Sequence, residues 1–132
     1  MTLRALTRDD VTIEVTCSPE DMHPDDSFGL DDPEEQKAIV DQILADAEWN
    51  EWAWCCVRVR VSWKGFHADD YLGACSYKSK EDFIESNDYY ADMVDNALEE
   101  LNKELSDTYE TLKALEHTNT AMYSDLKELS DG

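Results

Sequence analysis

The amino-acid sequence predicts an α+β fold: a small three-stranded antiparallel sheet, in the order β-α-β-β, packed on helices and followed by a long C-terminal helix of heptad character. Three patterns indicate it. Two regions alternate apolar and polar residues, an amphipathic helical segment lies between them, and apolar residues recur every three or four positions from residue 94 onward. We expect an acidic α+β head at residues 1–87 and a helical element at residues 88–132.

The bulk composition combines high charge with a large apolar content. The chain has 132 residues, 32 acids against 11 bases and a net charge of −21, yet 42 % of its residues are hydrophobic. That apolar content is sufficient for a folded core, so we do not expect disorder. The charge argues against nucleic acid as a direct ligand and against an anionic membrane surface. Because the sequence shows no apolar run of about 20 residues and no signal-type segment, we expect a cytoplasmic protein.

The first elements of the expected fold are a strand and a helix. Residues 11–17, VTIEVTC, alternate apolar and polar side chains, as a half-buried strand does. A helix is expected at residues 33–48, with Asp32 as its N-cap and Pro33 at its first position. Its apolar stripe is Ile39, Val40, Ile43, Leu44 and Ala47. We expect the sheet to pack on this helix.

The most strongly patterned strand is WAWCCVRVRVSW at residues 52–63. Its predicted core face is Ala53, Cys55, Val57, Val59, Val61 and Trp63. Trp52 and Trp54 are on the other face, where they serve either as exposed anchors for a partner or as cover for that face or a dimer interface. A loop of about five residues begins at Lys64, and DYLGACSY at residues 70–77 returns as the second strand of a hairpin. Gly73 permits a bulge or a close approach.

The C-terminal third is helical. Ser79 caps a short helix, and a longer one starts near Asn87 or Asp88. A single helix to residue 129 would be about 60 Å long, which is too long for the head to cover. Three arrangements remain open: pairing with the same helix of a second subunit, a helical hairpin broken at HTNT (117–120), or a helix whose first half covers the sheet while the tail is loosely attached. The expected dimerisation residues are Leu98, Leu101, Leu105, Leu112, Leu115 and Asn119.

Uncompensated acidity is the most informative functional signal. Residues 9–57 contain fifteen acids and one base, Lys37, and part of that acidity caps the first helix. The remainder forms a field of one sign, comparable to the phosphates that a nucleic-acid-binding protein recognises. A halophilic cytoplasm also favours such a composition. The predicted partner contacts are Glu20, Asp21, Asp25, Asp26, Asp31, Asp32, Glu34, Glu35, Asp41, Asp46, Glu48 and Glu51, with Asp69 and Asp70 as a secondary set at the hairpin loop.

No catalytic constellation is evident in the sequence. The three histidines occur in unrelated contexts, and the glycines form no phosphate-binding loop. The segment DDSFGLDD lacks the alternating ligands of a calcium loop. The cysteines have no metal-ligand spacing and are expected to be small buried hydrophobes: Cys17, Cys55, Cys56 and Cys75. We therefore predict a non-enzymatic protein without a cofactor or metal.

The segments AWC, LGACSY, EDF and YYADM, within residues 11–105, resemble a group of short acidic proteins encoded by bacteriophages and integrated elements. The resemblance brings no catalytic residues. It implies a phage or prophage gene expressed in a bacterial cytoplasm, a setting in which small acidic proteins inhibit CRISPR–Cas or restriction complexes. We therefore expect an anti-CRISPR or anti-restriction DNA mimic that binds a basic nucleic-acid-binding host complex. The alternative is a dimeric scaffold protein whose acidity serves solubility.

Overall fold

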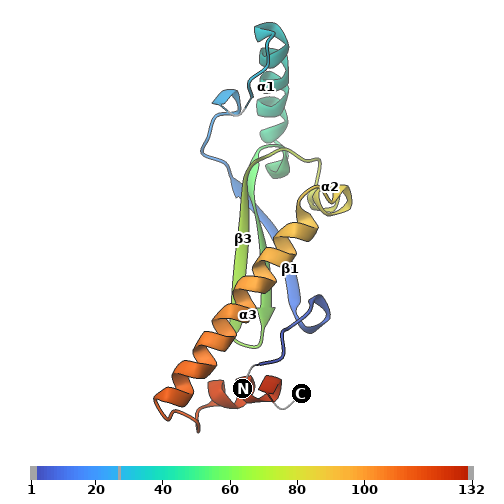
Figure 1. Cartoon of the computed structure of the whole chain (residues 1–132). Coiled ribbons are helices and arrows are strands. Elements are labelled where there is room, and N and C mark those ends of the chain that lie inside the picture. The colour runs from blue at the N-terminus through green and yellow to red at the C-terminus, as the bar shows by residue number, and fades with distance from the viewer. Residues whose placement is uncertain (1–2, 27, 131–132) are drawn as a thin grey trace. The chain divides into compact units, whose positions relative to one another are not determined.

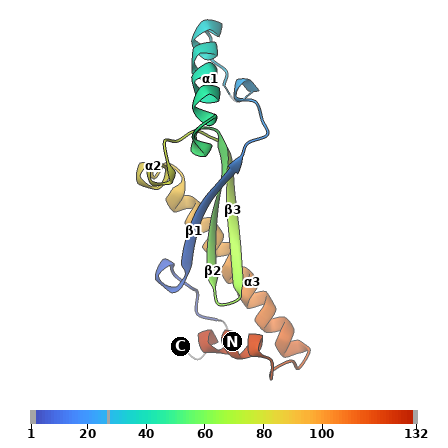
Figure 2. The same cartoon turned by 180° about the vertical axis from the view of Figure 1, so that it is seen from behind.

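A computed structural model describes residues 3–26 and 28–130, which form an α+β fold with a three-stranded antiparallel sheet and four α-helices. The strands are β1 (Thr12–Pro19), β2 (Cys55–Trp63) and β3 (Phe66–Cys75), side by side in that order (Figures 1 and 2). The α-helices are α1 (Pro33–Ala47), α2 (Lys80–Ser86), α3 (Tyr90–Ala114) and α4 (Ala121–Ser130). Three short 3-10 turns complete the fold: η1 (Arg8–Asp10), η2 (Pro24–Asp26) and η3 (Glu51–Ala53).

The chain divides into two compact units. Unit 1 consists of Met1–Glu14, Arg60–Asp69 and Val94–Gly132, and unit 2 consists of Val15–Val59 and Asp70–Met93. Unit 2 contains 18 acids and 4 bases, a net charge of −14, whereas unit 1 contains 14 acids and 7 bases, a net charge of −7. Two thirds of the net charge of the protein therefore belongs to unit 2.

The central strand β2 follows the predicted alternation. Cys55, Val57, Val59 and Val61 are completely buried, as expected for the core face. The hairpin is tighter than expected, because β3 already begins at Phe66 and only residues 64 and 65 connect the strands. The expected five-residue loop is wrong, since alternation continues through residues 66–69.

The tryptophans at the start of the predicted strand are buried, so of the two interpretations left open by the sequence, that of exposed anchors is wrong. Trp52 and Trp54 are each 8 % exposed. The chain forms η3 before β2 begins, so the strand alternation does not extend back to these positions. The Trp52 ring lies 6.1 Å from the ring of Phe83, a fully buried residue of unit 2, and Trp54 Nε1 donates to the Met22 carbonyl at 2.7 Å.

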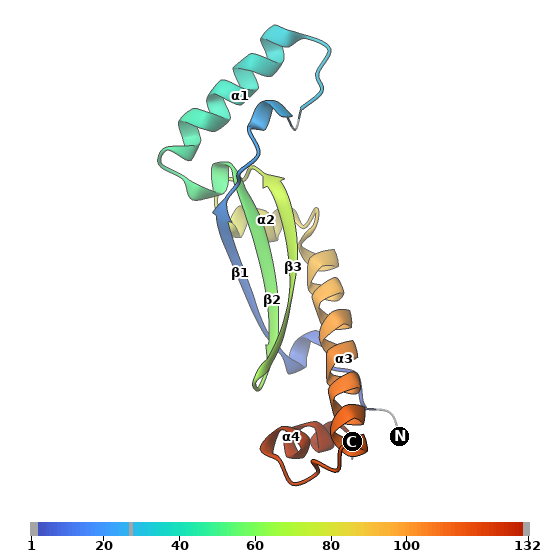
Figure 3. The same cartoon turned by 90° about the vertical axis from the view of Figure 1, so that its left-hand side faces the viewer.

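Helix α1 begins where the sequence predicted it, but it does not pack on the sheet. The Asp32 carboxylate accepts the Glu34 N–H at 3.0 Å and Pro33 occupies the first position. The main contacts of α1 are with η2 and η3, and Figure 3 shows it extending beyond the strand ends. Of its apolar stripe only Val40 and Ile43 are buried. The expectation that the sheet packs on this helix is therefore wrong, because α1 lies against η2 and η3 beyond the strand ends.

In unit 1 the C-terminal helices fold back on each other. Helix α3 ends in a Schellman motif: the His117 N–H donates to the Leu112 carbonyl at 2.9 Å and the Glu116 N–H to the Lys113 carbonyl at 3.1 Å. Glu116 has a φ of 60°. The chain then turns at the HTNT segment and α4 follows, so residues 88–129 do not form one continuous helix.

The segment that begins at Leu3 lies beside α4, where the Arg4 N–H donates to the Leu129 carbonyl at 3.0 Å (Figures 1 and 2). Asn102 on α3 holds the same segment from another side, because its side chain accepts the Leu6 N–H at 2.8 Å and donates to the Leu6 carbonyl at 3.2 Å. Leu101, Leu105 and Leu126 are buried between these elements. Unit 1 therefore has a core of its own.

Candidate functional site

The acidic segment before α1 is fixed to that helix by one side chain. Gln36 Nε2 donates to the Asp25 carboxylate at 3.0 Å, and Gln36 Oε1 accepts the Leu30 N–H at 3.1 Å. A hollow of about 510 Å³ lies between segment and helix, and its lining includes Leu30, Val40 and Leu44. The acidic segment is therefore held against α1 at Asp25 and Leu30.

Ten of the fourteen predicted partner-contact acids are exposed, and all ten belong to unit 2. We call them the acidic face: Asp21, Asp25, Asp26, Asp31, Asp32, Glu34, Glu35, Asp41, Glu48 and Glu51. Along α1, Glu34, Asp41 and Glu48 recur every seven residues, which places them about 10 Å apart on one side of the helix. The arrangement is a row of anions in fixed positions.

The other four predicted contacts, Glu20, Asp46, Asp69 and Asp70, are partly buried. Asp69 forms a two-pronged ion pair with Arg60, at 2.6 Å to Nε and 2.9 Å to Nη2. Asp46 accepts the Gln42 side-chain amide at 3.0 Å. Asp70 lies in β3. Because Asp69 and Asp46 are both partly buried and bonded within the protein, they are poorer candidates for partner contacts than the acidic face.

Glu20 is bound to the backbone of β3. Its carboxylate accepts the Ala74 N–H at 2.7 Å and the Met22 N–H at 3.1 Å. These backbone hydrogen bonds, with the Ala74 N–H first, hold the pKa of Glu20 below its ordinary value. The predicted close approach at Gly73 is confirmed, because a Cβ there would lie 2.8 Å from Glu20 Oε2. Ala74 itself has a positive φ of 55°.

The predicted dimerisation residues divide into two groups. Leu98, Leu101 and Leu105 are buried within unit 1, where they contribute to its core. Leu112 is partly buried, whereas Leu115 and Asn119 are exposed. A seam through all six residues is therefore not present on the surface of this chain, because half of it is already occupied by intramolecular packing.

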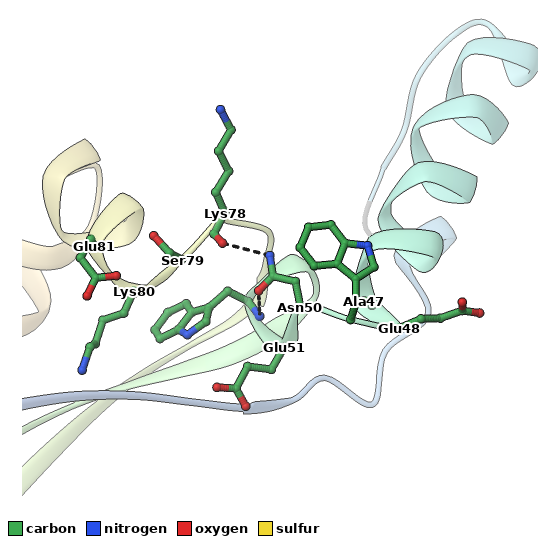
Figure 4. Close-up of a pocket in the computed structure, with 10 residues that line it drawn as sticks. Ala47, Glu48, Asn50, Glu51, Lys78, Ser79, Lys80 and Glu81 are labelled. Atoms are coloured by element: carbon green, nitrogen blue, oxygen red, sulfur yellow. Dashed lines mark hydrogen bonds between the residues drawn. The ribbon is translucent and has the colours of Figure 1, made fainter.

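The sequence interpretation missed Trp49, which is 76 % exposed and follows the end of α1. The next residue fixes its position: Asn50 Nδ2 donates to the Lys78 carbonyl at 3.0 Å, and Asn50 Oδ1 accepts the Trp52 N–H at 3.1 Å (Figure 4). We define the Trp49 hollow as the cavity of about 610 Å³ lined by residues 47–52 and 78–81. The sequence did contain a signal for an exposed residue here, because Trp49 lies between Glu48 and Glu51 at the end of the expected helix.

The buried thiols are poorly suited to nucleophilic chemistry. Burial raises the pKa of the Cys75 thiol to about 11 and raises that of Cys55 further. Within the part of the chain that the structure describes, no group of three or more histidine, cysteine or acidic side chains is placed to hold a metal ion. In the same residues, no helix is both long and apolar enough to cross a membrane.

The chemistry that the site offers is recognition of positive charge. Carboxylates held on a helix and a fixed loop attract lysine and arginine side chains at long range and form charge-assisted hydrogen bonds with them at short range. Glu20 and Asp32 orient the backbone that presents this surface. Comparison with protein-family models, curated proteins and solved structures finds no match to this chain.

Proposed function

We propose that this chain is a non-enzymatic anti-defence protein of a phage or mobile element, most specifically an anti-CRISPR. It acts as an acidic DNA mimic that occupies the nucleic-acid-binding surface of a Cas or restriction complex. The observation that carries the proposal is the acidic face: ten exposed carboxylates on one compact unit, contributed by α1, by η3 and by the segment that Gln36 bonds to α1. The resemblance to short acidic phage proteins supports the setting.

Fixed carboxylates favour mimicry over a purely solubilising role. Charge that only keeps a protein soluble functions equally well when it is spread over the whole surface. Here unit 2 carries a net charge of −14. A basic groove that normally holds DNA would exchange phosphates for these carboxylates, and opposite potentials would speed the association.

Apolar side chains within the same surface favour a folded protein as the partner. Met22, Leu30 and Leu44 are 44 %, 39 % and 40 % exposed, and they lie among the acids of the segment and of α1. Interfaces between proteins bury such residues at their centre and surround them with polar groups. The acidic face therefore combines charge for steering with apolar area for a stable complex.

The test is affinity capture of a bacterial lysate on the tagged protein at low salt, with elution by a salt gradient and identification by mass spectrometry. One variant neutralises four exposed acids of unit 2: Asp21→Asn, Asp31→Asn, Glu35→Gln and Asp41→Asn. Its matched control makes the same change of net charge on exposed acids of α3: Glu100→Gln, Glu104→Gln, Asp107→Asn and Glu110→Gln. The four acids of the first variant were chosen to spare Glu20, Asp25 and Asp32, which accept hydrogen bonds within the chain.

We expect the protein to retain a Cas, restriction or other nucleic-acid-binding complex that duplex DNA displaces, and the α3 control to retain it equally. The acidic-face variant should elute at much lower salt. Capture that resists duplex DNA, equal elution of both variants, or capture of only the protein itself would overturn the mimic mechanism, and the last result would favour the scaffold.

A further inference from the structure

Trp49 is the most exposed large hydrophobic side chain in the described part of the chain, and its backbone is held on several sides. The Trp49 N–H donates to the Asp46 carbonyl at 3.2 Å, and the Asn50 N–H donates to the same carbonyl at 2.9 Å. The Asn50 side chain bonds both η3 and the loop before α2. The backbone that carries the indole is therefore held by hydrogen bonds, while the ring itself is presented to solvent.

The charge around Trp49 determines which group suits it. Glu48 and Glu51 flank it in sequence, are exposed and line the Trp49 hollow. Lys78 and Lys80 line the opposite wall, and Figure 4 shows their side chains extending in opposite directions. A second hollow of about 540 Å³, lined in part by Asp46 and Asp82, also includes Trp49. Phosphates and nucleic-acid bases are disfavoured here, because unit 2 as a whole is strongly negative.

We propose that the Trp49 hollow binds an arginine side chain of the protein partner. The guanidinium plane stacks on the indole while its N–H groups pair with Glu48 or Glu51. Arginine fits better than lysine, because a planar, weakly hydrated cation can stack and hydrogen-bond at the same time. This inference rests on the proposed function, since it specifies one contact within the complex with a basic protein.

The test uses two probes of equal length and charge, a hexa-arginine and a hexa-lysine peptide, titrated at low ionic strength. Acrylamide quenching supplies the signal: Trp52 and Trp54 are buried and Trp63 is partly buried, so the difference between the wild type and Trp49→Phe isolates the contribution of Trp49. The variants are Trp49→Ala and Trp49→Phe, with Tyr89→Ala as a control at another exposed aromatic that is 50 % exposed. Thermal unfolding checks that each variant remains folded.

We expect the wild type to bind hexa-arginine more tightly than hexa-lysine, with protection of Trp49 from acrylamide. Trp49→Ala should weaken hexa-arginine binding roughly 5- to 30-fold, Trp49→Phe should retain part of it, and neither Trp49→Ala nor Tyr89→Ala should change hexa-lysine binding much. Equal affinity of the wild type for the two peptides, or hexa-arginine binding by Trp49→Ala at wild-type strength, would overturn the inference.

The acidic-face variant separates this inference from the proposed function. It should weaken the binding of both peptides alike, because it removes long-range attraction and leaves Trp49 in place. In the lysate experiment, one result is that the Trp49→Ala variant captures a complex that duplex DNA displaces, as the wild type does, whereas the acidic-face variant does not. That result would support the proposed function and overturn the arginine site. If Trp49→Ala abolishes discrimination between the peptides while no DNA-displaceable complex is captured, the arginine site stands without the mimic.

Discussion

Glu20 provides a sharp test of the structural reasoning, because the sequence interpretation assigned it to the partner surface whereas the structure bonds it to β3. In Glu20→Gln, one amide oxygen still accepts a backbone N–H, but the NH₂ group faces a second donor. Hydrogen bonds to a charged acceptor contribute about 1.5–3 kcal/mol each. Because the carboxylate is partly exposed, we expect a loss of about 1–2 kcal/mol in the free energy of unfolding.

Gly73 supplies the matched partner for a double-mutant cycle. A Cβ at residue 73 would lie 2.8 Å from Glu20 Oε2, and the φ of Gly73 is not positive, so Gly73→Ala acts through this contact. We expect Gly73→Ala to cost about 1 kcal/mol in the wild type and much less in Glu20→Ala, because the clashing oxygen is then absent. Urea unfolding followed by circular dichroism measures all four proteins. Additive effects of the two substitutions would refute the contact.

The pH dependence of the Glu20 contribution follows from its lowered pKa. A carboxyl whose pKa is lower in the folded protein stabilises the fold fully above its unfolded pKa, about 4.3. That stability is lost as the pH falls through the folded pKa, which lies below this value. The stability difference between wild type and Glu20→Gln should therefore be constant near neutral pH and disappear only in strong acid. A difference that vanishes between pH 6 and 7 would contradict this explanation.

Three further predictions concern unit 1, and urea unfolding measures each of them. Glu116→Gly should stabilise the protein by about 0.5–1 kcal/mol, because glycine adopts a positive φ without strain; unchanged stability would argue against the Schellman turn. Asp69→Asn should cost about 1–3 kcal/mol by breaking the pair with Arg60. Leu101→Ala should cost about 2–5 kcal/mol, whereas Leu115→Ala should change stability by less than about 0.5 kcal/mol; equal effects would favour the dimer seam.

The elements that the sequence predicted well depend on neighbouring residues. The Asp32 cap and Pro33 marked the start of α1, Ser79 caps α2 by accepting the Asp82 N–H at 3.1 Å, and the alternation of β2 gave its buried face. These signals act over a few positions, so their physical basis is visible in a short stretch of sequence. The exposed acidic face follows for the same reason, since a dense run of carboxylates cannot be buried.

The predictions that failed depended on residues far apart in the sequence. Alternation was extended back to Trp52, because nothing local reveals that η3 precedes the strand there. Glu20 meets the Ala74 N–H across 54 positions, and no pattern around either residue indicates that contact. The heptads of α3 were compatible with either a second subunit or α4. Periodicity reveals that a helix face is buried but does not identify what covers it.

The acidic face and the Trp49 hollow differ in how freely their residues can change over evolution. The side-chain amide of Asn50 is the reason for the difference. The electrostatic field of the acidic face is the sum of the contributions of many carboxylates. An acid that is lost at one position can therefore be replaced at another with little effect on the total field. The position of the backbone beside Trp49 is not such a sum, because it depends on the hydrogen bonds that Asn50 makes to η3 and to the loop before α2. Replacement of Asn50 by an uncharged apolar residue would leave the net charge unchanged. It would remove the hydrogen bonds that hold the backbone beside Trp49. The positions of the acids can therefore change during evolution with little effect. Asn50, which holds the backbone beside Trp49, can change much less freely.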